Sequence, residues 1–253
     1  MVFNITECVD FHHGKRIVIT ILVCGHDVVI IMHKEGDALL IQQPVYYPFR
    51  EVIEDNGRIF VNNQLHYEDG KYTIDFEDFE KKIVDNNVKV FILCNPHNPV
   101  GRVWTKEELE KMGDICLKHN VVIMDDEIHC DFTYPGFKFT SFMTLDEKYH
   151  NSLVLYTSPS KTFNVAGLQP ANIIIKNPEL RAAYRKANAA AGYSQGSIMG
   201  QVAVKSVYTK GDEWVNELVE YITGNMNYMR DFVKENFPKA HFVDPEGTCL
   251  LYT

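Results

Sequence analysis

The stretch Val88–Asp126, VKVFILCNPHNPVGRVWTKEELEKMGDICLKHNVVIMDD, decides the fold because it reads as strand, helix, strand. Its two ends carry the apolar runs VKVFILC and VVIMD, which lack the alternation of a half-exposed strand and suit strands buried on both faces. Between them TKEE (Thr105–Glu108) forms a capping box, and Leu109, Met112 and Cys116 follow at helical spacing. The pattern predicts a unit of a parallel sheet with a crossover helix.

The same pattern extends in both directions along the chain. Short apolar runs recur between segments of helical periodicity, which is typical of an α/β domain. We therefore predict the α/β class, with a mainly parallel sheet flanked by helices. The further expected elements are strands at Asp37–Gln43, Leu153–Thr157 and Asn172–Lys176, a helix capped by Asp75, and a long helix over Asp212–Asn236 closed by Pro238.

The composition narrows the class of protein. Of the 253 residues 45% are hydrophobic and 23% charged, which is usual for a globular protein. A net charge of −9 without a cluster of Lys and Arg argues against a nucleic-acid partner. No apolar run is long enough to span a membrane, and the six cysteines form neither a CxxC pair nor a metal motif. We expect a soluble cytoplasmic protein without a metal site.

Four polar motifs follow strands, at the edge where parallel sheets bind ligands. They are QQPVYYPF (Gln42–Phe49), NPHNPVG (Asn95–Gly101), DDEIH (Asp125–His129) and TSPSKTFNVAGLQ (Thr157–Gln169). Each alone has a plain explanation: packing tyrosines, turn chemistry, solvated acids at a strand end, an exposed lysine. Together they supply what pyridoxal 5′-phosphate (PLP) needs: a lysine for the Schiff base, a carboxylate for the pyridinium nitrogen, an aromatic face, and donors for the ring oxygen and phosphate.

These motifs resemble the fold-type I PLP-dependent enzymes, the class I/II aminotransferase superfamily. Within it they are most similar to cystathionine β-lyases (C–S lyases) of the MalY/PatB type. The resemblance runs from about Lys34 to Leu251 and rests on EGDALLIQQPVYYPF, CNPHNPVGRVW, DEIHCDF, SPSKTFNVAGLQ and PEGTCLL. It implies a divergent N-terminal segment at 1–33 and a PLP-binding large domain at 34–253. The small C-terminal domain would begin at about 240–253 and then be missing.

The resemblance also implies a role for each site residue. Lys161 would form the Schiff base and then remove the substrate Cα proton, and Asp126 would pair with the pyridinium nitrogen. The other cofactor contacts would be Asn98 and His129 near the ring oxygen, Tyr46 against the ring, and Ser158 and Ser160 at the phosphate.

The implied reaction is α,β-elimination from a cystathionine- or cysteine-type amino acid, giving pyruvate, ammonia and a thiol. Gln169 stands where many aminotransferases have an Arg, and His129 where they have a Tyr, so an aminotransferase is the second hypothesis. Because no G-x-G-x-x-G or P-loop pattern occurs, a nucleotide-binding protein is a distant third.

Two family features have no counterpart in the sequence. The glycine turn that binds phosphate before Lys34 is missing, with Gly25 as the one candidate substitute, and so is the Arg that grips the substrate carboxylate. We therefore expect poor or no turnover by this chain alone. A non-catalytic remnant that dimerises is the hypothesis of another class, while the full-length family is expected to form homodimers.

Overall fold

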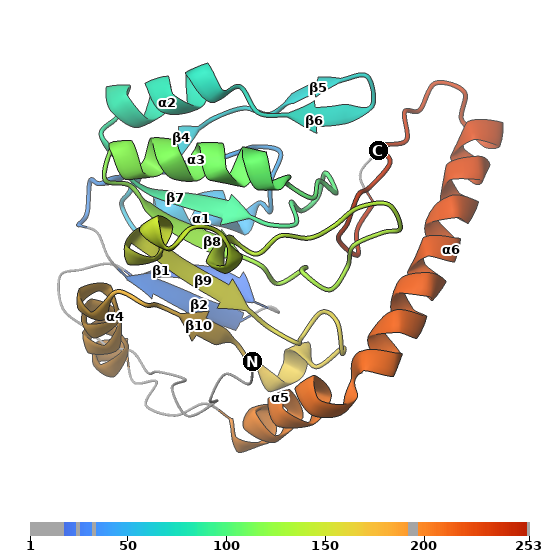
Figure 1. The fold of residues 1–253 in the computed structure, drawn as a ribbon. Coiled ribbons are helices and arrows are strands. Elements are labelled where there is room, and N and C mark those ends of the chain that lie inside the picture. Colours follow the sequence, from blue (N-terminus) through green and yellow to red (C-terminus); the bar gives the residue numbers. More distant parts are fainter. Residues whose placement is uncertain (1–17, 24–25, 32–33, 192–196, 252–253) are drawn as a thin grey trace.

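The computed structural model describes residues 18–23, 26–31, 34–191 and 197–251. Its centre is a six-stranded sheet in the order β10-β9-β8-β7-β3-β4 (Figure 1). All neighbours in this sheet are parallel except β10, which pairs antiparallel with β9 at the edge. The prediction of a mainly parallel sheet is confirmed. The strands are β3 (Ala38–Ile41), β4 (Ile59–Asn62), β7 (Val88–Cys94), β8 (Val122–Asp126), β9 (Leu153–Thr157) and β10 (Asn172–Ile174).

Helices cover both faces of the sheet. One hydrophobic cluster packs the sheet against α2 and α3, and the other packs it against α1 and α4. Long α6 extends away from the sheet (Figure 1). The α-helices are α1 (Pro48–Asp55), α2 (Phe76–Asp85), α3 (Lys106–Lys118), α4 (Pro178–Ala191), α5 (Ile198–Lys210) and α6 (Asp212–Asn236).

Short elements complete the described chain. Two antiparallel hairpins are formed by β1 (Val18–Val23) with β2 (His26–Ile31), and by β5 (His66–Glu68) with β6 (Lys71–Thr73). Three 3₁₀ turns are η2 (Phe142–Thr144), η3 (Glu147–Ser152) and η4 (Ala166–Leu168). Among the described helices, none combines the length and apolar character needed to cross a membrane.

Helix starts follow the sequence signals. The hydroxyl of Thr105 accepts from the backbone N–H of Glu108, whose carboxylate accepts from the N–H of Thr105, so the capping box is confirmed. Asp75 caps α2 by accepting from the N–H groups of Glu77 and Asp78. These caps satisfy amide donors that a helix start leaves unpaired. They fix where α2 and α3 begin, and hence where β7 and β8 enter the sheet.

Candidate active site

The loops after β3, β7, β8 and β9 lie at one edge of the sheet because these strands are parallel neighbours. The first two loops are joined where His97 Nε2 lies 3.0 Å from the carbonyl oxygen of Pro44. The next is joined where the N–H of Asn95 donates to the carbonyl of Asp126 at 2.9 Å. The expected convergence of the four motifs is therefore present in the structure.

Asp126 occupies the middle of this edge. It sits in register with Cys94 of β7 and Tyr156 of β9, and it is buried. Its Oδ1 accepts from the N–H of Ile128 at 3.1 Å, whereas Oδ2 has no partner among the described residues. Burial raises the pKa of Asp126 to about 6, against the opposing effects of that N–H and of the Lys161 ammonium.

Lys161 is exposed and makes no hydrogen bond or ion pair with another described residue. Its positive charge nevertheless acts to lower the pKa values of Asp126, His129 and Cys249. A lysine amine that is close to a buried carboxylate but not bound to it is available to react with an aldehyde.

His129 lies beside Cys249, with 3.8 Å between Nδ1 and Sγ. Burial, and next the nearby Lys161, lower the pKa of His129 to about 4, so the imidazole is neutral near pH 7. The sequence motif PEGTCLL brought Cys249 into the family resemblance, but nothing in its spacing from His129, 120 positions away, indicated that the two side chains touch.

The remaining predicted contacts are distributed around the same edge. The Asn98 backbone N–H donates to Cys94 Sγ at 3.4 Å, and its side chain is mostly buried. The hydroxyls of Ser158 and Ser160 lie 2.7 Å apart, both buried, and Ser158 also donates to the Pro170 carbonyl. Tyr46 is half-buried and packs edge-on against Phe49. Gly25 lies outside the described residues.

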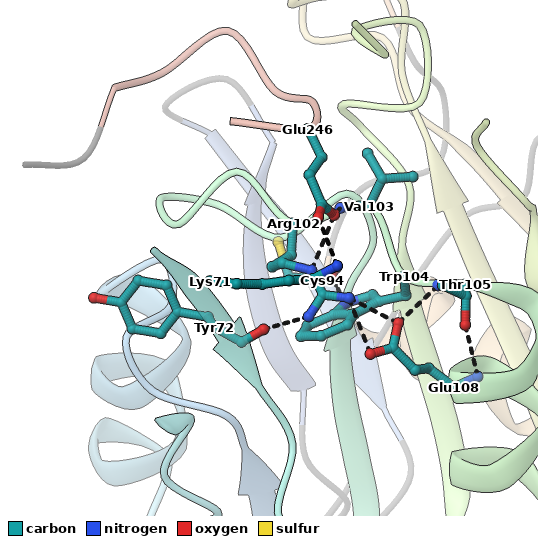
Figure 2. Close-up of polar contacts among 9 residues, drawn as sticks. All are labelled: Lys71, Tyr72, Cys94, Arg102, Val103, Trp104, Thr105, Glu108 and Glu246. Carbon is teal, nitrogen blue, oxygen red and sulfur yellow. Dashed lines mark hydrogen bonds and ion pairs between the residues drawn. The ribbon is translucent and has the colours of Figure 1, made fainter. Parts of the chain in front are cut away.

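A buried charge network holds the C-terminal segment 245–249 against this site (Figure 2). Arg102 donates from Nε to Glu246 at 2.9 Å and from Nη2 to both oxygens of Glu108 at 2.9 and 2.8 Å. Its Nη1 donates to the carbonyl of Tyr72, and its guanidinium lies over the Trp104 ring. The segment it anchors carries Cys249 to His129.

The close approach of this segment requires a glycine. Gly101 has φ +75, and a Cβ there would lie 2.7 Å from Pro245 Cβ. The Gly101 carbonyl accepts from the N–H groups of both Glu246 and Gly247. A side chain at 101 would therefore push the C-terminal segment away from the site.

The described residues fit PLP in the chemistry of their donors. Asp126 is a buried carboxylate with one oxygen unpaired, which suits a protonated ring nitrogen. At the same edge the amine of Lys161 would supply the nitrogen of an imine, and the mostly buried side chain of Asn98 would supply an amide donor. Ser158 and Ser160 would have to turn their hydroxyls from each other to a phosphate.

Comparison with known proteins places the chain in a family. Residues 24–253 match the family described as aminotransferase class I and II. The chain belongs to this family. It is 42% identical over 217 residues to cystathionine beta-lyase PatB of Bacillus subtilis (strain 168), covering 86% of this chain and 56% of that protein. It is 32% identical over 221 residues to protein MalY of Escherichia coli (strain K12), covering 86% and 55%.

Solved structures of this family share the fold. Cystalysin from Treponema denticola, whose structure contains a PLP cofactor, is 40% identical with a TM-score of 0.84, over 86% of this chain and 55% of that one. The PLP-bound C–S lyase from Staphylococcus hominis is 36% identical with a TM-score of 0.78, over 85% and 54%. The chain thus spans about half the length of the proteins it matches, and both of these solved structures contain PLP.

The structure rules out the alternative explanation of the DDEIH motif as solvated acids at a strand end, because Asp125, Asp126 and Glu127 are all buried. The reason is that β8 is a central strand, and the loops after its neighbours close over its end.

Proposed function

We propose that this chain carries the cofactor site of a PLP-dependent C–S β-lyase, which converts cystathionine- or cysteine-type amino acids to pyruvate, ammonia and a thiol. The observation that carries the proposal is the buried, half-paired carboxylate of Asp126 beside the unbound Lys161 amine. The similarity to PatB and to C–S lyase structures supports elimination over transamination.

In this proposal the chain's own residues divide the work. Lys161 Nζ holds the cofactor covalently and, once released, takes the proton from the substrate Cα. Asp126 keeps the ring nitrogen protonated, and Asn98 donates to the ring oxygen. Neutral His129 lies near that oxygen, Tyr46 flanks the ring, and Ser158 and Ser160 bind the phosphate. PLP, when bound, supplies the ring that accepts the electron pair left at Cα.

The proposed domain division follows the sequence interpretation: 1–33 is a divergent segment, 34–253 the PLP-binding domain, and about 240–253 the start of the small domain. The segment 245–249 packs on the large domain through Arg102, which supports its inclusion in 34–253. A homodimer in a reducing cytoplasm is part of the same proposal. Buried, free Cys94 and Cys116 support the reducing compartment, and light scattering would test the dimer.

The first test is the visible absorption spectrum of the purified chain with PLP, followed by borohydride reduction and peptide mapping. We expect a new band and a reduced adduct at Lys161. The Lys161→Ala variant should lose both, while its thermal midpoint without PLP should equal that of the wild type, because this side chain is exposed and unpaired. An adduct spread over surface lysines such as Lys89 or Lys138 would refute the cofactor site.

The second test is the product formed from cystathionine. Pyruvate and ammonia in equal amounts indicate elimination, whereas a keto acid formed together with the amine form of the cofactor indicates an aminotransferase. Since the chain spans about half of its relatives, a chain that maps PLP to Lys161 without forming either product would limit this proposal to cofactor binding.

A further inference from the structure

The acids on either side of Asp126 point to the opposite face of the sheet. Side chains alternate along β8: Met124 belongs to the cluster under α1 and α4, and Ile123 to the cluster under α2 and α3. Asp126 therefore shares its face with Met124, and Asp125 shares its face with Ile123. Glu127 follows Asp125, because its Oε1 accepts from the N–H of Phe142, a member of the second cluster.

Asp125 has no charged donor among the described residues to stabilise a negative charge, and the Asn95 side-chain amide is the uncharged group against it. It is fully buried, and both its carboxyl oxygens lack a hydrogen bond of normal geometry. It lies between Leu93 and Leu155 of the neighbouring strands, and the Glu127 carboxyl and the Asn95 side chain are against it. An ionised carboxylate in this position would be buried without a positively charged partner, beside a second carboxyl group, which costs more than keeping its proton.

We propose that Asp125 and Glu127 hold one proton between them at neutral pH, and that this acid pair is a positioning device behind Asp126. Asp125 carries the proton and donates it to Glu127. Glu127 remains the anion because it accepts from the Phe142 N–H and contacts Ser141. The Glu127 carboxylate thus ties the end of β8 to η2, while the backbone N–H of Glu127 donates to the Tyr156 carbonyl of β9 at 2.9 Å.

The electrostatics of the surroundings agree with this arrangement. Burial first, and then the charge of Glu127, raise the pKa of Asp125 well above its usual range, and burial also raises the pKa of Glu127. The other titratable groups that act on the pair are Asp126 and the Cys130 thiol. No Lys, Arg or His in the described part of the chain forms a hydrogen bond or ion pair with either carboxyl. Of the two acids on the opposite face of the sheet, only Glu127 then carries a negative charge near Asp126.

The proton count can be measured without cofactor. Above pH 5 the unfolded chain releases this proton while the folded chain keeps it. The pair should therefore raise the unfolding constant about tenfold for each unit by which the pH rises. In Asp125→Asn the amide donates to Glu127 and no proton is held. The ratio of wild-type to D125N unfolding constants, from urea titrations, should rise about a hundredfold from pH 5.5 to 7.5. Asp55→Asn, an exposed acid at the end of α1, is the matched control and should give a constant ratio.

Parallel pH curves for wild type and D125N would overturn the proposal. If D125N does not fold, the infrared spectrum of the wild-type chain at pH 7, with and without ¹³C-labelled aspartate, decides. A protonated-carboxyl band that shifts with the label supports the pair, and absence of the band refutes it.

The positioning role rests on the proposed function and has a separate readout. In D125N the negative charge of Glu127 remains, whereas in D125N/E127Q both side chains are neutral. Removing the charge of Glu127 should favour the ionised form of Asp126 in the double variant. We expect the pH midpoint of the PLP absorption band to be lower in the double variant than in D125N. An unchanged midpoint would refute the positioning role. No band in wild type would refute the proposed function while leaving the proton count standing.

Discussion

Replacing Arg102 by Met should destabilise the fold more than any surface charge change. The substitution removes a guanidinium that is 3% exposed and bound to Glu246, Glu108 and the Tyr72 carbonyl (Figure 2). Breaking a buried ion pair from one side costs about 3–5 kcal/mol, because the other charge stays buried without a partner. Lys71, 3.0 Å from the second oxygen of Glu246, still compensates part of that charge. We therefore expect a loss of about 3 kcal/mol, near the lower end of this range.

Urea unfolding followed by circular dichroism measures this loss, as a fall in the midpoint at constant slope. The matched control is Lys81→Met, which breaks the exposed i,i+4 pair with Asp85 and should cost only about 0.3–0.5 kcal/mol. Because the lost interaction is shared, E246L and R102M should also be non-additive: the double variant should be more stable than the sum of the single losses by at least about 1 kcal/mol. A loss for R102M as small as that of K81M, or strict additivity, would refute the reasoning.

Three further outcomes follow from local geometry. Thr105→Ala should cost about 1 kcal/mol in urea unfolding, since the N–H of Glu108 at the start of α3 loses the hydroxyl that accepts from it; Thr105→Ser, which keeps the hydroxyl, should cost far less. Gly113→Ala should cost about 1–3 kcal/mol despite the better helix propensity of Ala, because the new methyl would lie 2.6 Å from the Tyr149 ring; a gain in the thermal midpoint would contradict this. Burial lowers the pKa of His97 to about 4, so below pH 6.5 the unfolded chain binds more protons than the folded chain. As the pH drops from 6.5 toward 4, His97 should therefore raise the unfolding constant about tenfold per pH unit. In His97→Gln the loss of stability over this pH range should be smaller, and an unchanged slope would show that other groups cause it.

The sheet could be predicted because its signals are local. The capping box at Thr105 and the unalternating runs VKVFILC and VVIMD are each contained in a few residues, and the structure places β7, α3 and β8 within one residue of them. The segment Arg16–His33 had no clean period, and its described parts form the hairpin of β1 and β2. An antiparallel ribbon of apolar residues on both faces gives no alternation to detect.

The supporting contacts of the site could not be predicted because they are not local. Arg102 and Glu246 are 144 positions apart, and His129 and Cys249 are 120 apart. Nothing in the spacing of such residues distinguishes an ion pair from two exposed charges. Asp125 illustrates the same limit: its burial depends on which strands flank β8, which is a property of the sheet order and not of the DDEIH motif.

The two groups of buried acids differ in how their charge is balanced. Glu246 and Glu108 are neutralised within the protein by Arg102 and Lys71, so that network is complete without a ligand. At the end of β8, the proton held by Asp125 leaves Glu127 with amide and hydroxyl donors, but Asp126 receives a single N–H and only the nearby charge of Lys161. A buried carboxylate with half its bonding capacity unused is unfavourable unless a cation completes it. The protonated pyridine ring of PLP is such a cation, and PLP would be bonded to Lys161, next to Asp126. The incomplete balance at Asp126, set against the complete one at Arg102, is therefore the physical reason to expect that PLP stabilises this chain against unfolding, and that Lys161→Ala removes most of that stabilisation.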